Sequence, residues 1–252
     1  MKAIESVAIR AIGVVLLAVG ATACSDSGGH QDHAVSSVVT SQPVSPVGEL
    51  PLCGDVDHVD EHQVLADCRL QSIDGSGLAF SVHYIPSFGR YPWVDAGVRI
   101  EVSGPDGRVR QTLMQTGNFE MVEPRLADLA GDGRQELIVT LNLTITGNSD
   151  DQVYVSTAAT SGKFALAGKA DGTRLEREVD GLLIDLVHIS AGSHAYSVYR
   201  LTDTKLENLI EIEDDPDAHG HHCDYVVPPT LAGTGLTLDQ ARTRYCALLT
   251  GR

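Results

Sequence analysis

The sequence predicts a mainly β domain, built as an antiparallel β-sandwich, barrel or partial propeller, with one helix near the C-terminus. Segments in which apolar and polar residues alternate recur between about residues 64 and 212. Asp-Gly pairs, which suit the positive φ angles of tight hairpin turns, separate several of these segments. A single helical pattern follows close to the end of the chain.

The expected strands are rich in β-branched and aromatic residues. Residues 98–102 (VRIEV), for example, alternate with a period of two, as a half-buried strand does. The clearest segments are 79–85, 98–102, 136–143, 152–156, 182–189, 196–201 and 206–212. About 150 residues of strand pattern would form roughly ten to twelve strands, or about three four-stranded blades, whereas a closed propeller typically needs at least four. A closed propeller is therefore disfavoured.

A helix is predicted over residues 238–249. Thr237 and Gln240 match a capping box, in which each side chain accepts a hydrogen bond from the backbone N–H of the other residue. Apolar residues then recur at helical spacing at Leu238, Ala241, Tyr245, Leu248 and Leu249. That stripe is expected to pack on the sheet.

The N-terminus has the features of an export signal. Lys2 and Arg10 form a weakly basic start, and residues 11–20 (AIGVVLLAVG) form an apolar run. A helix of that length is too short to span a bilayer, which needs about 20 residues, but it suits a signal peptide. Small residues follow directly before Cys24.

The segment Ala21-Thr22-Ala23-Cys24 resembles a bacterial lipobox, with Ala21 where Leu is usual. The resemblance implies removal of residues 1–23, acylation of Cys24 (palmitate) and anchoring of the chain to the membrane outside the cytoplasm. An ordinary signal peptidase would cut the same bond and release a secreted chain instead. Residues 24–48 then form the lipidated cysteine and a Ser-, Gly- and Pro-rich flexible tether, and residues 49–252 form a single disulfide-stapled domain.

The chain contains five cysteines, and an odd thiol in an exported protein needs an explanation. Lipidation of Cys24 would leave four that can pair in three ways. Proximity in the sequence favours Cys53 with Cys68 and Cys223 with Cys246, which would close short loops.

The formal net charge of −16 bears on the partners of the chain. An acidic surface repels phosphate backbones, so nucleic-acid binding is not expected. It also repels anionic lipid head groups, so any contact with the membrane would depend on the lipid anchor.

Residues 126–139 (LADLAGDGRQELIV) resemble the loop of FG-GAP/VCBS-type repeats, in which acidic residues around a glycine-bent loop bind calcium before an apolar strand. Carried over by position, Asp128, Asp132 and Glu136 would supply side chains and Arg134 a backbone carbonyl for Ca²⁺. Ala130 departs from the family pattern, which has Asn or Asp there, so one oxygen is missing. The alternative is a hairpin turn whose aspartates accept backbone N–H groups.

Two histidine-rich acidic segments adjoin the cysteines. His58 and His62 lie in the first, and His221 and His222 lie in the second. If the disulfides bring these segments together, their imidazoles could share a transition metal. The alternative is a pair of solvated, acidic loops.

The sequence has no Gly-x-Ser-x-Gly, no His-Glu-x-x-His and no phosphate-binding loop. It therefore favours a non-catalytic binding or structural module outside the cytoplasm, with Ca²⁺ as a stabilising ligand and an unknown protein or glycan as partner. The alternative is a secreted hydrolase or metal-dependent enzyme whose site is built from dispersed His and Asp residues.

Overall fold

The structure, a computed structural model, describes residues 50–55, 65–85, 97–117, 122–144, 146–158, 161–178, 180–190, 193–217, 220–225, 231 and 234–250. Contacts between residues place Val44–Arg252 in one compact unit. The predicted export signal, Cys24, the predicted tether, His58 and His62 lie outside the described residues.

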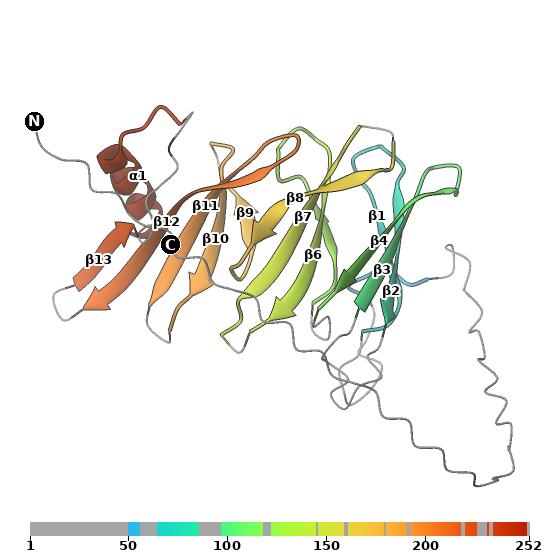
Figure 1. The fold of residues 1–252 in the computed structure, drawn as a ribbon, viewed down its shortest axis with the longest axis horizontal. Coiled ribbons are helices and arrows are strands. Elements are labelled where there is room, and N and C mark those ends of the chain that lie inside the picture. The colour runs from blue at the N-terminus through green and yellow to red at the C-terminus, as the bar shows by residue number, and fades with distance from the viewer. Residues whose placement is uncertain are drawn as a thin grey trace, which may run out of the picture. The chain divides into compact units, whose positions relative to one another are not determined.

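Thirteen strands and one helix make up the described part of this unit (Figure 1). They are β1 (Cys68–Gln71), β2 (Ala79–Ile85), β3 (Gly97–Ser103), β4 (Val109–Thr116), β5 (Arg125–Ala127), β6 (Glu136–Leu143), β7 (Ser149–Ser156), β8 (Phe164–Ala170), β9 (Leu175–Arg177), β10 (Leu183–His188), β11 (His194–Leu201), β12 (Leu206–Asp217), β13 (Gly220–Tyr225) and α1 (Leu238–Thr250). The predicted fold class is confirmed.

The strands form three antiparallel sheets, and in each of them neighbours in sequence are neighbours in space. The first sheet is β1-β2-β3-β4, the middle sheet is β5-β6-β7-β8, and the last sheet is β13-β12-β11-β10-β9. This simple up-and-down order is that of a propeller blade. The described strands close no barrel.

The middle sheet is buried on both faces, because its strands alternate between two cores. On β6, Leu137 and Val139 pack against residues of the first sheet, while Ile138 packs against residues of the last sheet. On β7, Tyr154 faces the first core, and its neighbours Val153 and Val155 face the second. Such a strand needs apolar residues at nearly every position, as residues 137–139 provide.

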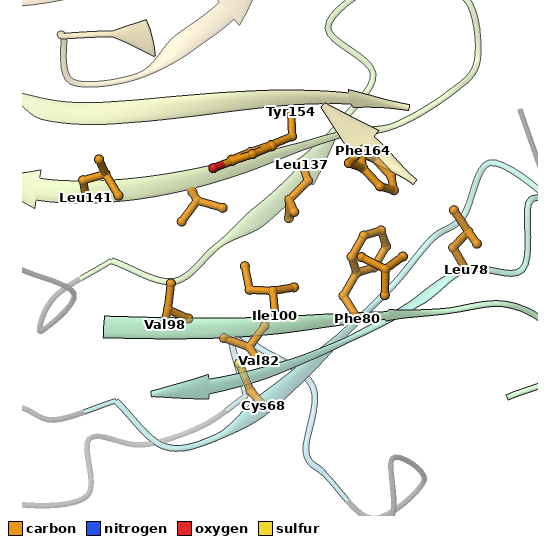
Figure 2. Packing of buried hydrophobic residues seen from close by; sticks show 12 residues of the cluster. Cys68, Leu78, Phe80, Val82, Val98, Ile100, Leu137, Leu141, Tyr154 and Phe164 are labelled. Carbon is orange, nitrogen blue, oxygen red and sulfur yellow. The ribbon is translucent and has the colours of Figure 1, made fainter. Parts of the chain in front are cut away.

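Figure 2 shows the first of these cores, in which side chains of the first and middle sheets interdigitate. Phe80 and Ile100 from the first sheet are at most 1% exposed. The ring of Phe80 meets the edge of Phe164, with centroids 5.5 Å apart, which is a favoured arrangement of aromatic pairs.

Helix α1 covers the outer face of the last sheet through two residues of its predicted stripe. Ala241 and Tyr245 are at most 2% exposed and belong to one core with Ile210 and Ile212 of β12. The predicted capping box is present. The Thr237 N–H donates to Gln240 Oε1 over 2.9 Å, and the Gln240 N–H donates to Thr237 Oγ1 over 3.3 Å.

The four cysteines of this unit form the two disulfides that proximity favoured. Cys53–Cys68 joins the segment before the first sheet to β1, and Cys223–Cys246 joins β13 to α1. Among the described residues, α1 is the only helix, and no helix is long and apolar enough to cross a membrane.

The expectation of an acidic loop after residue 212 was wrong. Strand β12 continues to Asp217 and pairs with β13, with Asp215 opposite His222 and Pro216 opposite His221. Side-chain composition suggested a loop, but strand pairing uses the backbone, and β12 pairs there with the edge strand β13. The total of thirteen strands therefore exceeds the expected ten to twelve.

One carboxylate is almost completely buried in the last sheet. Asp185 on β10 is 1% exposed and accepts hydrogen bonds from the N–H groups of Gly172 (2.6 Å) and Arg174 (3.0 Å) in the turn before β9. Burial raises the pKa of Asp185 to about 6, although these two hydrogen bonds favour the charged form. A Cβ at position 172 would collide with this carboxylate, so the turn requires glycine there.

Replacing Asp185 with Asn should flatten the pH dependence of stability between about pH 4 and about pH 6. The pKa of Asp185 is about 6 in the folded chain against an ordinary value of 3.8, so the folded state holds this proton more tightly. Its contribution to the free energy of unfolding is therefore full below pH 3.8 and is lost as the pH rises through about 6. A shift of about two units corresponds to about 3 kcal/mol.

Urea unfolding of wild type and Asp185→Asn at several pH values measures this difference in slope. Asp203→Asn, at an exposed position, is the matched control and should keep the wild-type slope. Parallel stability curves for wild type and Asp185→Asn would contradict the assignment.

Candidate functional site

The loop between β5 and β6 is organised by one carboxylate. Asp128 Oδ1 accepts hydrogen bonds from the N–H groups of Gly131 (2.6 Å) and Asp132 (3.1 Å), and its Oδ2 accepts one from Gly133 (3.0 Å). Asp side chains commonly close turns in this way. Both Asp128 oxygens therefore have backbone partners within the loop.

The other two acidic residues of the loop also have partners. Glu136, which is 5% exposed, accepts N–H groups of Leu129 (2.7 Å) and Ala130 (3.3 Å) through Oε2. Burial raises the pKa of Glu136, and the two hydrogen bonds oppose that shift. Asp132 is paired with Arg134, whose Nε lies 2.7 Å from Oδ2, and this hydrogen bond lowers the pKa of Asp132.

The loop in this arrangement does not present a calcium donor set. Ca²⁺ takes six to eight oxygens, but Asp132 is occupied by Arg134, and Ala130 has no side-chain oxygen. Within the described ranges no group of three His, Cys, Asp or Glu side chains is placed to hold a metal. Calcium binding through Asp128, Asp132, Arg134 and Glu136 would require Asp132 to leave Arg134, and it stays a prediction.

The last sheet contacts this loop through Arg177 on β9. Gly131 has a φ of 70°, and a Cβ at this position would collide with the guanidinium of Arg177. Glycine is therefore required twice over, by the backbone conformation and by the close approach. Helix α1 contacts the last sheet at the β9–β10 turn, where Arg244 forms an ion pair with Asp180.

The first sheet is fastened to the same loop by a reciprocal pair of hydrogen bonds. The Ile73 N–H in the β1–β2 turn donates to Gln135 Oε1 over 2.7 Å, and Asp74 Oδ2 accepts the Gln135 N–H over 3.0 Å. Asp74 also bonds to Ser72 and Ser76. Partial burial alone would raise the pKa of Asp74, but these hydrogen bonds together lower it to about 2.

The turn that these hydrogen bonds hold in place exposes the side chain of Ile73 to solvent. The side chain is 86% exposed, although its backbone is held by Gln135. Sequence analysis did not identify Ile73 or Gln135, because their contact joins residues 62 positions apart. The only local signal is an isolated apolar residue inside a Ser-Ile-Asp-Gly turn.

An open cavity of about 550 Å³ lies beside Ile73, between β1 and the segment leading into β5. Leu52 and Ile73 contribute apolar surface to it. Arg69 and Arg125 contribute positive charge, and Asp55 and Glu123 contribute negative charge. Arg125 forms an ion pair with Asp151 over 3.5 Å, and burial is the main cause of its lowered pKa. Arg69 donates through Nε to the Leu50 carbonyl over 2.9 Å. The cavity therefore combines an apolar rim with charged groups of both signs.

The histidines singled out from the sequence are not brought to this cavity by any described contact. His58 and His62 lie outside the described residues. His221 and His222 stand on β13 of the last sheet, and only their backbone pairing is described. Shared metal binding by these four histidines stays a prediction.

No protein-family model and no curated protein matches the chain. One solved structure that is similar to it is described as the structure of a Xanthomonas type IV secretion system related protein. It is 15% identical, the match covers 62% of this chain and 87% of that chain, and the TM-score is 0.44. A similarity of this size carries no conclusion about function.

Proposed function

We propose that the chain is a lipid-tethered, extracytoplasmic binding module that docks another protein through the surface around Ile73. This docking surface consists of Ile73, Leu52 and the cavity beside them. The observation that carries the proposal is an apolar side chain left 86% exposed on a turn that two hydrogen bonds hold to Gln135, one through the Ile73 N–H and one through the Asp74 carboxylate.

A rigid apolar projection suits binding for an energetic reason. A flexible side chain or loop loses conformational freedom when it binds, whereas a turn that is already ordered loses less. Apolar anchors that enter a pocket of the partner provide much of the binding energy at protein interfaces, and polar groups surround them. Charged residues of both signs, Arg69, Arg125, Asp55 and Glu123, line the cavity in that peripheral role. The partner is therefore expected to receive Ile73 in an apolar pocket that is bordered by polar groups.

The proposed compartment rests on the cysteines. Two disulfides support an oxidising environment outside the cytoplasm, and a lipid on Cys24 accounts for the fifth cysteine. The tether over residues 24–48 would hold the domain away from the membrane.

A dispersed hydrolytic site is the second candidate, and no specific observation favours it. Burial raises the pKa of three described acids, Glu136, Asp171 and Asp185, and the negative charge of Asp150 adds to the shift of Asp171. Asp185 and Glu136 are at most 5% exposed and bind backbone N–H groups, whereas Asp171 is exposed. The described lining of the cavity beside Ile73 includes no histidine. A general acid or base must reach the substrate, which the buried positions of Asp185 and Glu136 oppose.

A photo-cross-linking residue in place of Ile73 is expected to trap the partner in the native compartment. The same residue in place of Leu166, which is 49% exposed on β8, is the matched control and should trap none. Leu52→Asp on the same rim should abolish the adduct formed from position 73, while Leu166→Asp should leave it unchanged. Protease digestion of the adduct tests whether the partner is a protein, and a glycan adduct or equal adducts from both positions would contradict the proposal.

Cys24→Ala is expected to remove palmitate labelling and to move the chain from the membrane fraction to the soluble extracytoplasmic fraction. The thiol of Cys24 is the acceptor of the lipid, so no other residue can replace it. Ser25→Ala next to it is the control and should keep the label. Labelling of Cys24→Ala, or recovery of wild type in the cytoplasm with reduced cysteines, would refute the anchoring.

Calcium as a structural ligand of the Asp128–Glu136 loop is tested by melting. The resemblance to FG-GAP/VCBS loops predicts that Ca²⁺ in the range of about 10⁻⁴ to 10⁻³ M, typical for extracellular modules, raises the melting temperature of wild type. Asp132→Ala should lose this increase, whereas Asp239→Ala, at an exposed position in the first turn of α1, should keep it. Identical wild-type melting curves in Ca²⁺ and in chelator would contradict calcium binding. The loop would then be the alternative, a turn whose carboxylates accept its own backbone N–H groups.

A further inference from the structure

Two histidines face each other at the end of the β10–β11 hairpin. His188 and His194 are Cα partners, and their ring centroids lie 5.0 Å apart. The Ile189 N–H donates to the Ser193 carbonyl over 3.0 Å, so the adjacent histidine pair is a non-hydrogen-bonded pair. In such pairs the side chains of antiparallel strands come closest together.

The ring of His188 is oriented by the β6–β7 loop of the middle sheet. Its Nδ1 lies 2.9 Å from the carbonyl oxygen of Thr146. A carbonyl only accepts, so Nδ1 carries the proton of the neutral ring, and Nε2 carries the lone pair. Histidines that bind metals usually donate their other ring N–H to such an acceptor, which fixes both tautomer and orientation.

The backbone of His188 is fixed by the same loop. The side-chain amide of Asn148 donates to the His188 carbonyl over 2.8 Å and accepts the His188 N–H over 2.8 Å. Asn148 is in turn bonded to Thr144, through its N–H to Thr144 Oγ1 (3.1 Å) and through its carbonyl, which accepts the Thr144 N–H (2.8 Å). One imidazole of the pair is thus held in place before any ligand arrives.

The separation of the rings suits two ligands of one ion. A zinc–nitrogen bond is about 2.0–2.1 Å, and the ring centre lies roughly 1.1 Å beyond the nitrogen, so two tetrahedral imidazole ligands place their ring centroids about 5 Å apart. The observed distance is 5.0 Å. An edge-to-face contact between the rings, which are inclined at 80°, would give the same separation without a metal.

The two rings offer two nitrogen ligands to one metal ion. We propose that the pair binds a divalent transition-metal ion such as Zn²⁺, with His188 Nε2 and a ring nitrogen of His194 as ligands. Imidazole nitrogens suit such ions, and water completes the coordination.

Calorimetric titration of the intact chain with Zn²⁺ tests the proposal. His188→Phe and His194→Phe keep a ring in the hairpin but remove the nitrogen ligands. Wild type is expected to bind one equivalent of Zn²⁺ at least about tenfold more tightly than either variant. His83→Gln in the first sheet is the control and should titrate like wild type. Metal-free melting temperatures of the variants show whether they fold.

The other histidines of the chain can also take up Zn²⁺, so a local signal is required. Nitrogen NMR of wild type should show that Zn²⁺ shifts the Nε2 resonance of His188, while Nδ1 keeps its proton; this reading does not depend on the folding of any variant. Unmoved His188 resonances, or equal uptake by wild type and both Phe variants, would overturn the proposal in favour of ring packing alone.

Discussion

The arrangement of this chain depends on burying both faces of the middle sheet. Strands β6 and β7 place successive side chains in two different cores, so neither face can be left to solvent without a large loss of apolar burial. The first sheet covers one face and the last sheet covers the other. The last sheet then has an outer face of its own to cover, and α1 covers it.

Much of this architecture is readable from the sequence, because it rests on local patterns. Residues 79–85 and 136–143 were predicted as strands with the bounds that the structure gives to β2 and β6, since alternating or continuous apolar residues are flanked there by turn residues. The capping box located the start of α1. The short strands β5 and β9, of three residues each, were missed because a pattern cannot be established over so few positions.

The sites were less predictable than the strands, because the decisive contacts join distant residues. The acidic loop was located by its spacing, but its hydrogen bonds to N–H groups and to Arg134 emerge only from the folded backbone. Ile73 depends on Gln135, and His188 depends on Asn148, 40 positions away. Nothing near Ile73 or His188 in the sequence indicates these partners.

A repeated feature became visible only in the folded chain. The first hairpin of each sheet ends in an Asp-Gly turn, and Gly75, Gly133 and Gly181 adopt φ angles of 81°, 83° and 81°. These hairpins are linked in series, since the first contacts Gln135, the second contacts Arg177, and the third contacts Arg244. Each hairpin therefore fastens its own layer to the next one.

The positions of the disulfides have a consequence for how such a series of layers comes apart. In a quasi-one-dimensional array each layer is stabilised by its neighbours, so the outermost elements, with a neighbour on one side only, are the first to fray. Cys53–Cys68 and Cys223–Cys246 cross-link the two outermost elements, and among the described residues no disulfide crosses the interior. Reduction should therefore loosen the two ends of the array first, and the middle sheet stays ordered only as long as both of its neighbours still cover it. The redox state of the surroundings would thus control how the chain begins to unfold.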